Sequence, residues 1–233
     1  MGRVPWQQYS SYLRYTGGAP ANIQLGAAHQ QHTLSFTICP AAATTTVLSA
    51  SATHSPLTIM TTIRRFTCND LFTFNNVNLD ILTETYNLPF YLQYLARWPE
   101  YCLLAEGPGK QAMGYILGKA EGKGKLWHGH VTAVTVAPDF RRQALARKLM
   151  NMLEEITDKV HNAYFVDLFV RVSNSVAINM YKGFGYSVYR TVLNYYAGDE
   201  DAYDMRKAMP RDVKKESVIP LSRPVKPEDL EFD

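Results

Sequence analysis

The sequence predicts an α+β domain with α/β/α layers, in which helices flank a mixed, mostly antiparallel sheet. Two apolar runs, 101–105 and 112–120, are separated by a glycine-rich turn and predict an antiparallel hairpin. Strand-like and helical segments then alternate between 127 and 195, which is typical of a sheet that carries helices on its faces. The chain has 233 residues, of which 46% are hydrophobic, so one domain can bury a substantial core.

The chain divides into three parts by composition. Residues 1–59 contain no acidic residue and only two basic ones, Arg3 and Arg14, and are rich in Ala, Thr, Ser and Gln. We expect a disordered N-terminal extension there; a targeting sequence is the alternative, although transit peptides are usually richer in arginine. The folded domain is expected over 60–209, and the proline-containing segment 210–233 is expected to form an extended tail.

The folded part is predicted to begin with a strand over 60–66, followed by two helices. Thr67 and Asp70 fit a capping box, which predicts a helix that continues to about 82. Its apolar face is expected to consist of Leu71, Phe72, Phe74 and Val77. A second helix is predicted over 89–97, because proline suits its first turn and Trp98-Pro99 ends it.

Two further strands and two helices are predicted after the hairpin. Residues 127–136 are rich in β-branched side chains and predict a long strand. A helix is predicted over 140–159, where apolar residues recur at helical spacing. The apolar run 164–172 predicts a buried strand, and Asn174 suits the N-cap of a short helix over 176–182. The segment 186–195 predicts one bent strand or two short ones.

Charge and cysteine content narrow the class of protein. The net charge of +3 is too small to indicate nucleic-acid binding, and no apolar run approaches the ~20 residues that span a membrane. The three cysteines, Cys39, Cys68 and Cys102, lack metal-ligand spacing. They indicate reduced thiols, and we expect no metal site.

Residues 131–146 predict an anion-binding site. A β-branched strand ends at Pro138 and Asp139, and Arg141 and Arg142 stand at the entry of the following helix. The first turn of a helix presents unpaired N–H groups and the positive end of the helix dipole, and arginine adds charged donors for phosphate. A strand-to-helix turn with two solvated arginines is the alternative interpretation.

The same stretch carries a family resemblance. Residues 141–146 (R-R-Q-A-L-A) resemble the R-x-x-G-x-A acyl-CoA signature of the GNAT acetyltransferases, with Ala144 in place of the usual glycine. Asn174-x-x-Ala177-x-x-x-Tyr181 resembles the second half of that family's cofactor site. Four longer segments between residue 60 and about 231 resemble the catalytic subunits of NatB, acetyltransferases of nascent N-termini: M-T-T-I-R-R-F-T-C-N-D-L-F, N-L-P-F-Y-L-Q-Y-L-A-R-W-P-E-Y, W-H-G-H-V-T-A-V and D-E-D-A-Y-D-M-R-K-A.

The resemblance implies a GNAT fold and acetyl-CoA as the acetyl donor. It places the pantetheine arm against the backbone near Val134 and Val136. The remaining cofactor contacts that it implies are Arg141, Arg142, Gln143, Ala144, Leu145, Ala146, Asn174 and Tyr181. If the backbone at Ala144 is right-handed helical, its methyl group adds only contact with the ligand, so we expect weaker but not abolished binding.

His130 and Tyr181 are the catalytic residues that the resemblance implies. Because a peptide α-amine has a pKa of about 7.7–8.0, roughly 10–20% of it is neutral at pH 7 and a strong base is unnecessary. His130 is the candidate for substrate contact or proton relay, and Tyr181 for protonating the leaving thiolate. His128 is expected on the same face of the strand and remains an alternative. Without the family, a packing role is the simpler interpretation for each residue.

The substrates that the resemblance implies are chains beginning Met-Asp, Met-Glu, Met-Asn or Met-Gln. Its substrate groove corresponds to Glu84, Tyr86, His130, Thr132, Asn174, Tyr195 and Tyr196. Tyrosine hydroxyls can bond peptide backbone while the rings pack on methionine. His130 and Asn174 are the candidate partners of the second side chain, and hydrogen bonding would explain why acid and amide are both accepted.

The resemblance also implies partners and a compartment. NatB catalytic subunits work with a helical-repeat auxiliary subunit at the ribosome, so we expect a cytoplasmic protein whose first two helices form the docking face. Family members begin at the position of Met60, which suggests that 1–59 is an extension from an upstream start. Two alternatives remain: a GNAT enzyme that acetylates lysine or a small amine, and a non-catalytic GNAT-fold partner weakened by Ala144.

Overall fold

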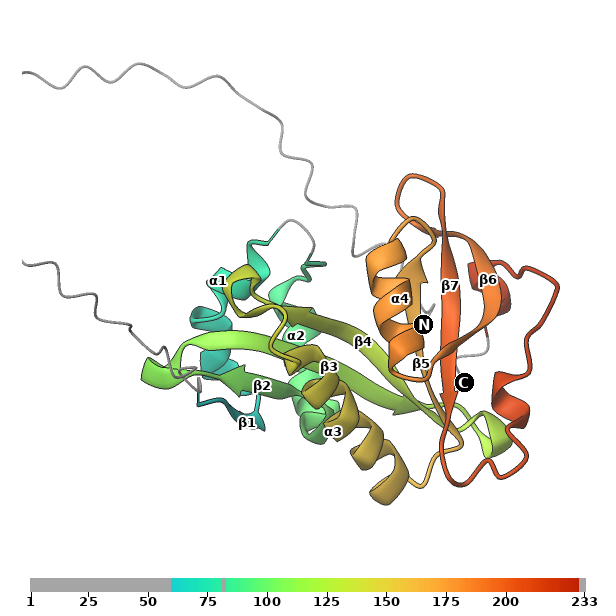
Figure 1. Ribbon diagram of the computed structural model, residues 1–233, viewed down its shortest axis with the longest axis horizontal. Helices are drawn as coiled ribbons and strands as arrows, with labels where there is room; N and C mark the ends of the chain where they lie inside the picture. The colour runs from blue at the N-terminus through green and yellow to red at the C-terminus, as the bar shows by residue number, and fades with distance from the viewer. Residues whose placement is uncertain (1–59, 81–82, 231–233) are drawn as a thin grey trace, which may run out of the picture. The chain divides into compact units, whose positions relative to one another are not determined.

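The computed structural model describes residues 60–80 and 83–230, so the predicted extension 1–59 lies outside the described residues. Within them, seven strands form one sheet in the order β1-β2-β3-β4-β5-β7-β6 (Figure 1). Neighbouring strands run antiparallel except β4 and β5, which run parallel. The strands are β1 (Thr62–Arg65), β2 (Leu103–Glu106), β3 (Ala112–Glu121), β4 (His128–Val136), β5 (Phe165–Arg171), β6 (Ser187–Tyr196) and β7 (Glu200–Ala208). This confirms the predicted mixed, mostly antiparallel sheet.

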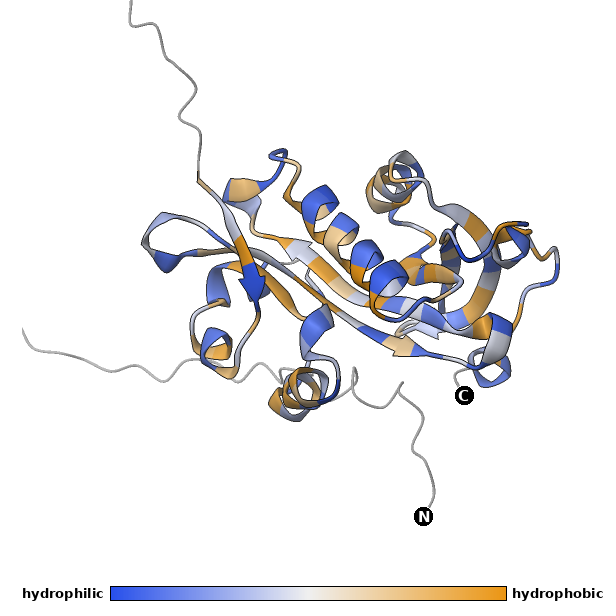
Figure 2. Cartoon of the chain, turned by 90° about the horizontal axis from the view of Figure 1, so that it is seen from below, coloured by the Kyte–Doolittle hydropathy of each residue, from blue (hydrophilic) through white to orange (hydrophobic). Residues whose placement is uncertain are grey.

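Helices cover both faces of the sheet, as the predicted α/β/α layering requires (Figure 2). Helices α1 (Asn75–Asn78) and α2 (Leu88–Arg97) lie on one face, and α3 (Leu145–Lys159) and α4 (Ser175–Gly183) on the other. Strand β2 shows the alternation: Leu103 and Ala105 pack with the α3 and α4 side chains, whereas Leu104 packs with the α1 and α2 side chains. Two cores therefore hold the sheet between two helical layers.

Helix α2 closely matches its prediction. It begins at Leu88 with proline in its first turn, and its N-cap Asn87 accepts a hydrogen bond from the backbone N–H of Phe90 at 3.0 Å. Phe90, Tyr91 and Tyr94 are buried against the sheet. This aromatic core fixes the helix next to β3 and β4, which carry predicted site residues.

The first predicted helix is wrong in extent. A 3₁₀ turn (Cys68–Phe72) is followed by the single-turn α1, instead of one helix from 67 to about 82. The capping box is confirmed, because the Asp70 carboxylate accepts the backbone N–H of Thr67 at 2.7 Å. Three of the four residues of α1 are asparagine, which has low helix propensity and accounts for a helix of a single turn. Phe72 is 78% exposed and does not belong to the apolar face.

Helix α3 begins at Leu145, five residues later than predicted. Residues Pro138–Phe140 form a 3₁₀ turn, and the loop after it contains Arg142 and Ala144 with φ of 66° and 60°. A right-handed helix cannot pass through such residues. Periodicity identified the apolar face correctly, because Leu145, Leu149 and Leu153 are buried, but it could not locate the start.

Strand β7 was not predicted, although it lies between β5 and β6 and pairs antiparallel with both. Its sequence lacks the usual apolar pattern of a strand, because the buried Asp204 and Arg206 interrupt it. Segment 186–195 forms the single strand β6 with register shifts. Residues 210–230 contain only short 3₁₀ turns, and Val225 forms a parallel bridge with Val192. This part of the tail therefore lies against β6.

Two observations on the described residues concern membrane spans and cysteines. None of their helices has the length and apolarity that crossing a bilayer requires. Cys68 is exposed and Cys102 is buried, and both are free thiols; Cys39 lies outside the described residues.

Candidate active site

The candidate site forms where β4 leaves β5. The two strands pair only from His128 opposite Phe165 to Val131 opposite Leu168. A bulge follows: Val131 pairs with Gly118 and Ala133 with Leu117, so Thr132 has no residue opposite it in β3. Beyond the bulge, the β4 backbone has no ladder partner on the β5 side among the described residues. Its N–H and C=O groups there can bind an extended ligand, at the predicted positions Val134 and Val136.

The predicted phosphate-binding loop leads into α3. Ala144 is the N-cap of this helix and has no side-chain oxygen to bond the first N–H groups. Gln143 and Ala146 are half-buried around the helix start, and the Leu145 side chain belongs to the core, so only its backbone can face a ligand. The N–H groups at this end therefore lack a side-chain cap and lie at the positive end of a fifteen-residue helix, an arrangement that favours an anion.

The two arginines of this loop differ in their surroundings. Arg142 is exposed, so its guanidinium can reach a bound phosphate. Arg141 donates from Nε to the carbonyl of Val136 at 3.1 Å and forms an ion pair with Asp80. The sequence had not singled out Asp80. This ion pair ties the end of the α1 region to the phosphate-binding loop and offsets part of the charge expected for the anion site.

The backbone of Ala144 is left-handed, with φ of 60° and ψ of 18°. The expectation that its methyl group adds only ligand contact is therefore wrong, because it assumed a right-handed backbone. A non-glycine residue in this region carries a conformational cost of about 1–2 kcal/mol. Glycine would adopt the same backbone freely, which gives a physical reason for glycine at this position of the acyl-CoA signature.

A buried cluster of charged groups surrounds His130. His130 and His128 lie on the same side of β4, as expected from their spacing, and both approach the carboxylate of Asp167. The distances to Asp167 Oδ1 are 2.8 Å from His130 Nδ1 and 3.5 Å from His128 Nε2. Burial favours the neutral acid, but His128, His130 and Arg206 outweigh it and hold the pKa of Asp167 well below its usual range.

The same cluster contains groups that bind metals in other proteins. One ligand atom from each of Glu121, His128 and His130 lies within 4.8 Å of the other two. Glu121, however, is paired with Lys119 at 2.5 Å, and His130 is paired with Asp167. A cation would have to compete with both of these protein contacts. These contacts are those of a buried network of charged side chains.

Tyr181 and Asn174 lie on or next to α4. Tyr181 is 9% exposed, and burial raises its pKa to about 12. Its phenol therefore keeps its proton at neutral pH, as a proton donor must. Asn174 is confirmed as the N-cap, since its Oδ1 accepts the N–H of Ala177 at 3.1 Å. Its side-chain oxygen thus already accepts one hydrogen bond, while its NH₂ group is directed away from the helix backbone as a donor for a ligand.

One wall of the predicted substrate groove comes from the segment before α2. The ring of Tyr86 stacks on Phe90 at 4.2 Å, and its hydroxyl donates to the carbonyl of Thr132 at 3.4 Å. The hydroxyl of Thr132 in turn donates to Tyr94 at 2.9 Å. The predicted residues Tyr86 and Thr132 are therefore joined directly, at the β4 bulge.

The opposite wall comes from the end of the β6 strand. Tyr195 packs on Phe169 at 4.7 Å, and Phe169 also contacts the His130 ring at 5.5 Å. Tyr196 lies beside Tyr195, with ring centroids 5.1 Å apart. Through Phe169, the predicted tyrosine pair is thus connected to the predicted catalytic histidine.

Two residues that the sequence analysis missed connect these parts. Arg171, at the end of β5, binds Glu84 at 2.8 Å and Glu200 at 2.8 Å. Asp167, in the middle of β5, binds His130. A single acidic residue in the otherwise apolar run Y-F-V-D-L-F-V was the available signal for Asp167. Arg171 carried no comparable signal, because a charged residue at a strand end is common.

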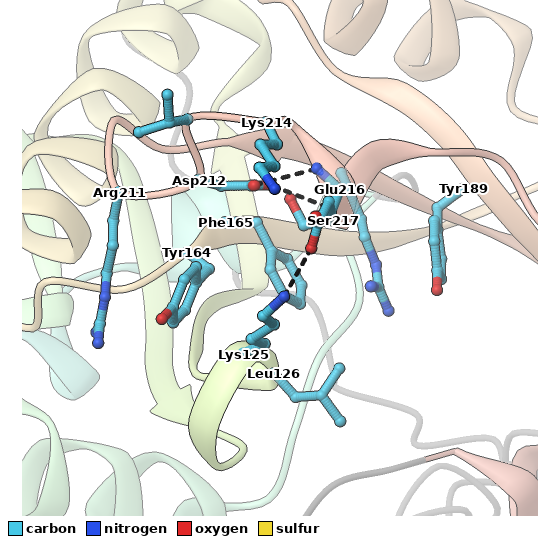
Figure 3. Close-up of a pocket in the computed structure, with 12 residues that line it drawn as sticks. Lys125, Leu126, Tyr164, Phe165, Tyr189, Arg211, Asp212, Lys214, Glu216 and Ser217 are labelled. Atoms are coloured by element: carbon cyan, nitrogen blue, oxygen red, sulfur yellow. Dashed lines mark hydrogen bonds and ion pairs between the residues drawn. The ribbon is translucent and has the colours of Figure 1, made fainter.

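A pocket of about 310 Å³ lies elsewhere, near the start of β5 (Figure 3). Tyr164 and Phe165 line it, and Lys125 reaches across to Glu216 at 2.8 Å. None of its lining residues is a predicted site residue. His130 and Thr132, by contrast, lie on β4 where it leaves β5.

Comparisons with known proteins agree with this geometry. Residues 69–186 match the acetyltransferase (GNAT) family. The N-terminal acetyltransferase B complex catalytic subunit NAA20 of Arabidopsis thaliana is 66% identical over 174 residues, which cover 75% of this chain and 100% of that protein.

Solved structures give the same result. The crystal structure of Chaetomium thermophilum Naa20 in complex with a bisubstrate analogue has a TM-score of 0.68 and 46% identity, and the match covers 72% of this chain and 97% of that one. A NatB acetyltransferase complex bound to CoA and MES has a TM-score of 0.60 and 46% identity, and the match covers 64% of this chain and 99% of that one. The chain therefore belongs to the GNAT acetyltransferases and, within them, to the family of NatB catalytic subunits.

Proposed function

We propose that this protein transfers the acetyl group of acetyl-CoA to the α-amine of proteins that begin Met-Asp, Met-Glu, Met-Asn or Met-Gln. Family membership supports the reaction class. The observation that carries the proposal is that two aromatic walls meet β4 where it leaves β5: Tyr86 contacts Thr132, and Phe169, beside Tyr195, contacts His130. A groove of this kind suits an extended chain terminus with a methionine side chain.

Acetyl-CoA fits the residues at this divergence. The pyrophosphate meets the open N–H groups at the start of α3 and the exposed Arg142. The pantetheine arm meets the β4 backbone at Val134 and Val136, where β4 has no ladder partner on the β5 side. The same backbone N–H groups are the candidate donors to the thioester oxygen, on which negative charge develops during transfer.

The reaction joins the α-amine nitrogen to the acetyl carbon and releases the CoA thiolate, which needs a proton. Tyr181 is the candidate donor, because burial raises its pKa to about 12 and its phenol stays protonated. The α-amine reacts as the neutral fraction that is already present near pH 7, roughly 10–20%. His130 contacts the substrate, and water or His130 accepts the amine proton.

The partner in this proposal is a helical-repeat auxiliary subunit. Four large apolar side chains in or beside α1 and α2 are exposed in the isolated chain: Phe72, Leu79, Leu88 and Leu92. Exposed apolar side chains gathered near two adjacent helices favour a protein interface there. A related complex, NatB bound to CoA and MES, supports an assembly of this type. In this proposal the protein acts on nascent chains at the ribosome, in the cytoplasm.

Acetyl transfer by the full chain, co-expressed with its auxiliary subunit, tests the proposal. The peptides begin Met-Asp, Met-Leu and Ser-Glu, and a peptide with an internal lysine is the control. Preference for Met-Asp is the expected result. Acetyl transfer to the lysine peptide or to the Met-Leu peptide would show that the proposed substrate class is wrong. No transfer to any peptide by a folded complex would favour a non-catalytic role, for which the strained Ala144 is the specific observation.

A further inference from the structure

Asp167 occupies a central place in the buried charge cluster. Its direct neighbours in the sheet are His130 on β4 and Arg206 on β7. Its side chain is buried, and Oδ1 lies 2.8 Å from His130 Nδ1. An ionised carboxylate in the middle of an apolar strand is costly unless its partners compensate it. Packing alone therefore does not account for a carboxylate at position 167.

The contact with Asp167 determines the hydrogen positions on His130. An ionised carboxylate only accepts hydrogen bonds, so His130 Nδ1 carries a hydrogen. Its Nε2, on the other side of the ring, points away from Asp167. When His130 is neutral, Nε2 is an acceptor; when His130 is protonated, Nε2 is a donor and Asp167 compensates the positive charge. Asp167 thus fixes the ring while leaving two chemical states at Nε2.

The neighbouring charges are mostly paired among themselves. Lys119 and Glu121 of β3 form an ion pair at 2.5 Å, and Arg206 of β7 contacts Asp204 at 3.1 Å. His128 donates from Nδ1 to the carbonyl of Leu126 at 2.6 Å, since a carbonyl only accepts. Among the described residues, Tyr195 of β6 packs on Phe169, which contacts the His130 ring, and Tyr94 of α2 accepts a hydrogen bond from Thr132, two residues from His130. Asp167 is the carboxylate in direct contact with His130.

We propose that Asp167 is a positioning residue that sets the preference for the second substrate residue through His130. This inference rests on the proposed function. Asp, Glu, Asn and Gln share a terminal oxygen that accepts a hydrogen bond, and protonated His130 donates Nε2–H to it. Neutral His130 presents a lone pair at Nε2, which accepts from the NH₂ group of Asn or Gln but repels a carboxylate. Amide substrates therefore suit both states, and acidic substrates suit only the protonated one.

The first test uses the wild-type complex and the ratio of kcat/KM for Met-Asp and Met-Asn peptides between pH 6 and pH 9. Deprotonation of the substrate amine affects both peptides in the same way, so the ratio removes it. The ratio is expected to fall as pH rises, because deprotonation of His130 removes the donor that the acidic side chain needs. A ratio that does not change with pH would overturn the inference and leave the proposed function intact.

The second test replaces the carboxylate by an amide of the same shape, Asp167→Asn. Hydrogen bonds to charged groups contribute more than neutral ones, so the Met-Asp to Met-Asn ratio at pH 7 is expected to fall about tenfold. Asp70→Asn is the matched control: it removes a buried carboxylate that contacts Arg64 but not His130, so the ratio stays at its wild-type value. Thermal unfolding of both complexes measures any general damage.

The outcomes separate the two proposals. An unchanged ratio in Asp167→Asn, or an equal fall in the Asp70→Asn control, would contradict a specific role of Asp167. If the variant does not fold, the wild-type pH series still decides. ¹⁵N NMR of the His130 ring gives a second measurement on the wild type, with hydrogen expected on Nδ1 throughout. Failure of the wild-type complex to acetylate either peptide would instead overturn the proposed function, and this inference with it.

Discussion

The guanidinium of Arg171 lies over the ring of Tyr196, with its central carbon 4.1 Å from the ring centroid. The same side chain binds Glu84, which precedes α2, and Glu200, at the start of β7. Both Glu84 and Tyr196 were predicted to line the substrate groove, and they lie on the two walls described above. Arg171 therefore connects the two walls, and the carboxylate predicted to meet the substrate is already engaged by this arginine.

Replacing Arg171 by glutamine is expected to loosen the groove without touching the reacting atoms. The partly exposed ion pairs and the cation–π contact together contribute about 1–1.5 kcal/mol, so KM for a Met-Asp peptide is expected to rise about fivefold to tenfold. The kcat should stay within about twofold, since the interaction affects binding and not the transition state. Lys159→Gln, at the far end of α3, removes an exposed charge as the control. An unchanged KM in Arg171→Gln would show that the walls hold without this contact.

The hydroxyl of Tyr181 is expected to matter for kcat rather than for peptide binding. Tyr181→Phe keeps the buried ring and its contacts with Phe184 and Tyr186 but removes the proton that the leaving thiolate needs. General acid catalysis contributes about 10²–10⁴-fold, so kcat should fall at least about a hundredfold while KM changes little. Steady-state kinetics with saturating acetyl-CoA measure this. A fall below about threefold would assign the proton transfer to water.

Ala144→Gly is expected to stabilise the protein, which is unusual for a glycine substitution. The left-handed backbone costs alanine about 1–2 kcal/mol, and glycine loses about 0.4–1 kcal/mol more entropy on folding, so a net gain of about 0.5–1 kcal/mol remains. The unfolding temperature should rise by about 2 °C. Isothermal titration should show acetyl-CoA binding at least as tight as in the wild type, because no methyl group faces the phosphates.

Ala96→Gly is the matched control for this change. Ala96 lies in the α2 helix on an exposed position, where glycine costs about 1 kcal/mol. The two alanine-to-glycine variants should therefore shift the unfolding temperature in opposite directions. Shifts of the same sign would mean that the backbone at Ala144 is not left-handed in solution.

The sequence predicted most strands and the α2 and α4 helices because their signals are local. Apolar alternation, proline in a first turn and an N-cap asparagine depend on a few neighbouring residues, as at Asn87 and Asn174. The start of α3 was missed because periodicity cannot detect left-handed residues such as Arg142 and Ala144. Strand β7 was missed because its buried charges find partners on other strands, which no local pattern records.

For the candidate site, the sequence named residues but not their contacts. Family motifs pointed to His130 on β4, to Tyr181 on α4 and to the phosphate-binding loop before α3. The motifs did not indicate what each group contacts. Asp167 and Arg171 act through the side chains of residues far away in the sequence, and Arg141 is paired with Asp80. Such pairs depend on the assembled sheet and cannot be read from spacing.

The Asp70 carboxylate is expected to make the stability of the protein depend on pH in the acid range. Asp70 accepts two hydrogen bonds from Arg64 and one from the backbone of Thr67. Burial alone would favour its neutral form, but these donors outweigh it and hold the pKa of Asp70 below its usual range. A carboxyl group with a lowered pKa in the folded state stabilises the protein above its unfolded pKa, about 3.9, and this stabilisation is lost as pH falls through the folded value.

Asp70→Asn is therefore expected to lower the free energy of unfolding by about 1–2 kcal/mol at pH 7, a modest value because Arg64 is partly exposed. The difference from the wild type should shrink as the pH falls below about 4, where the wild-type carboxylate also becomes protonated. Urea unfolding between pH 2.5 and pH 7 measures both. Glu155→Gln, an exposed acid on α3, should run parallel to the wild type over the same range. A constant difference for Asp70→Asn across the whole range would mean that packing, and not the charge of Asp70, stabilises the turn after β1.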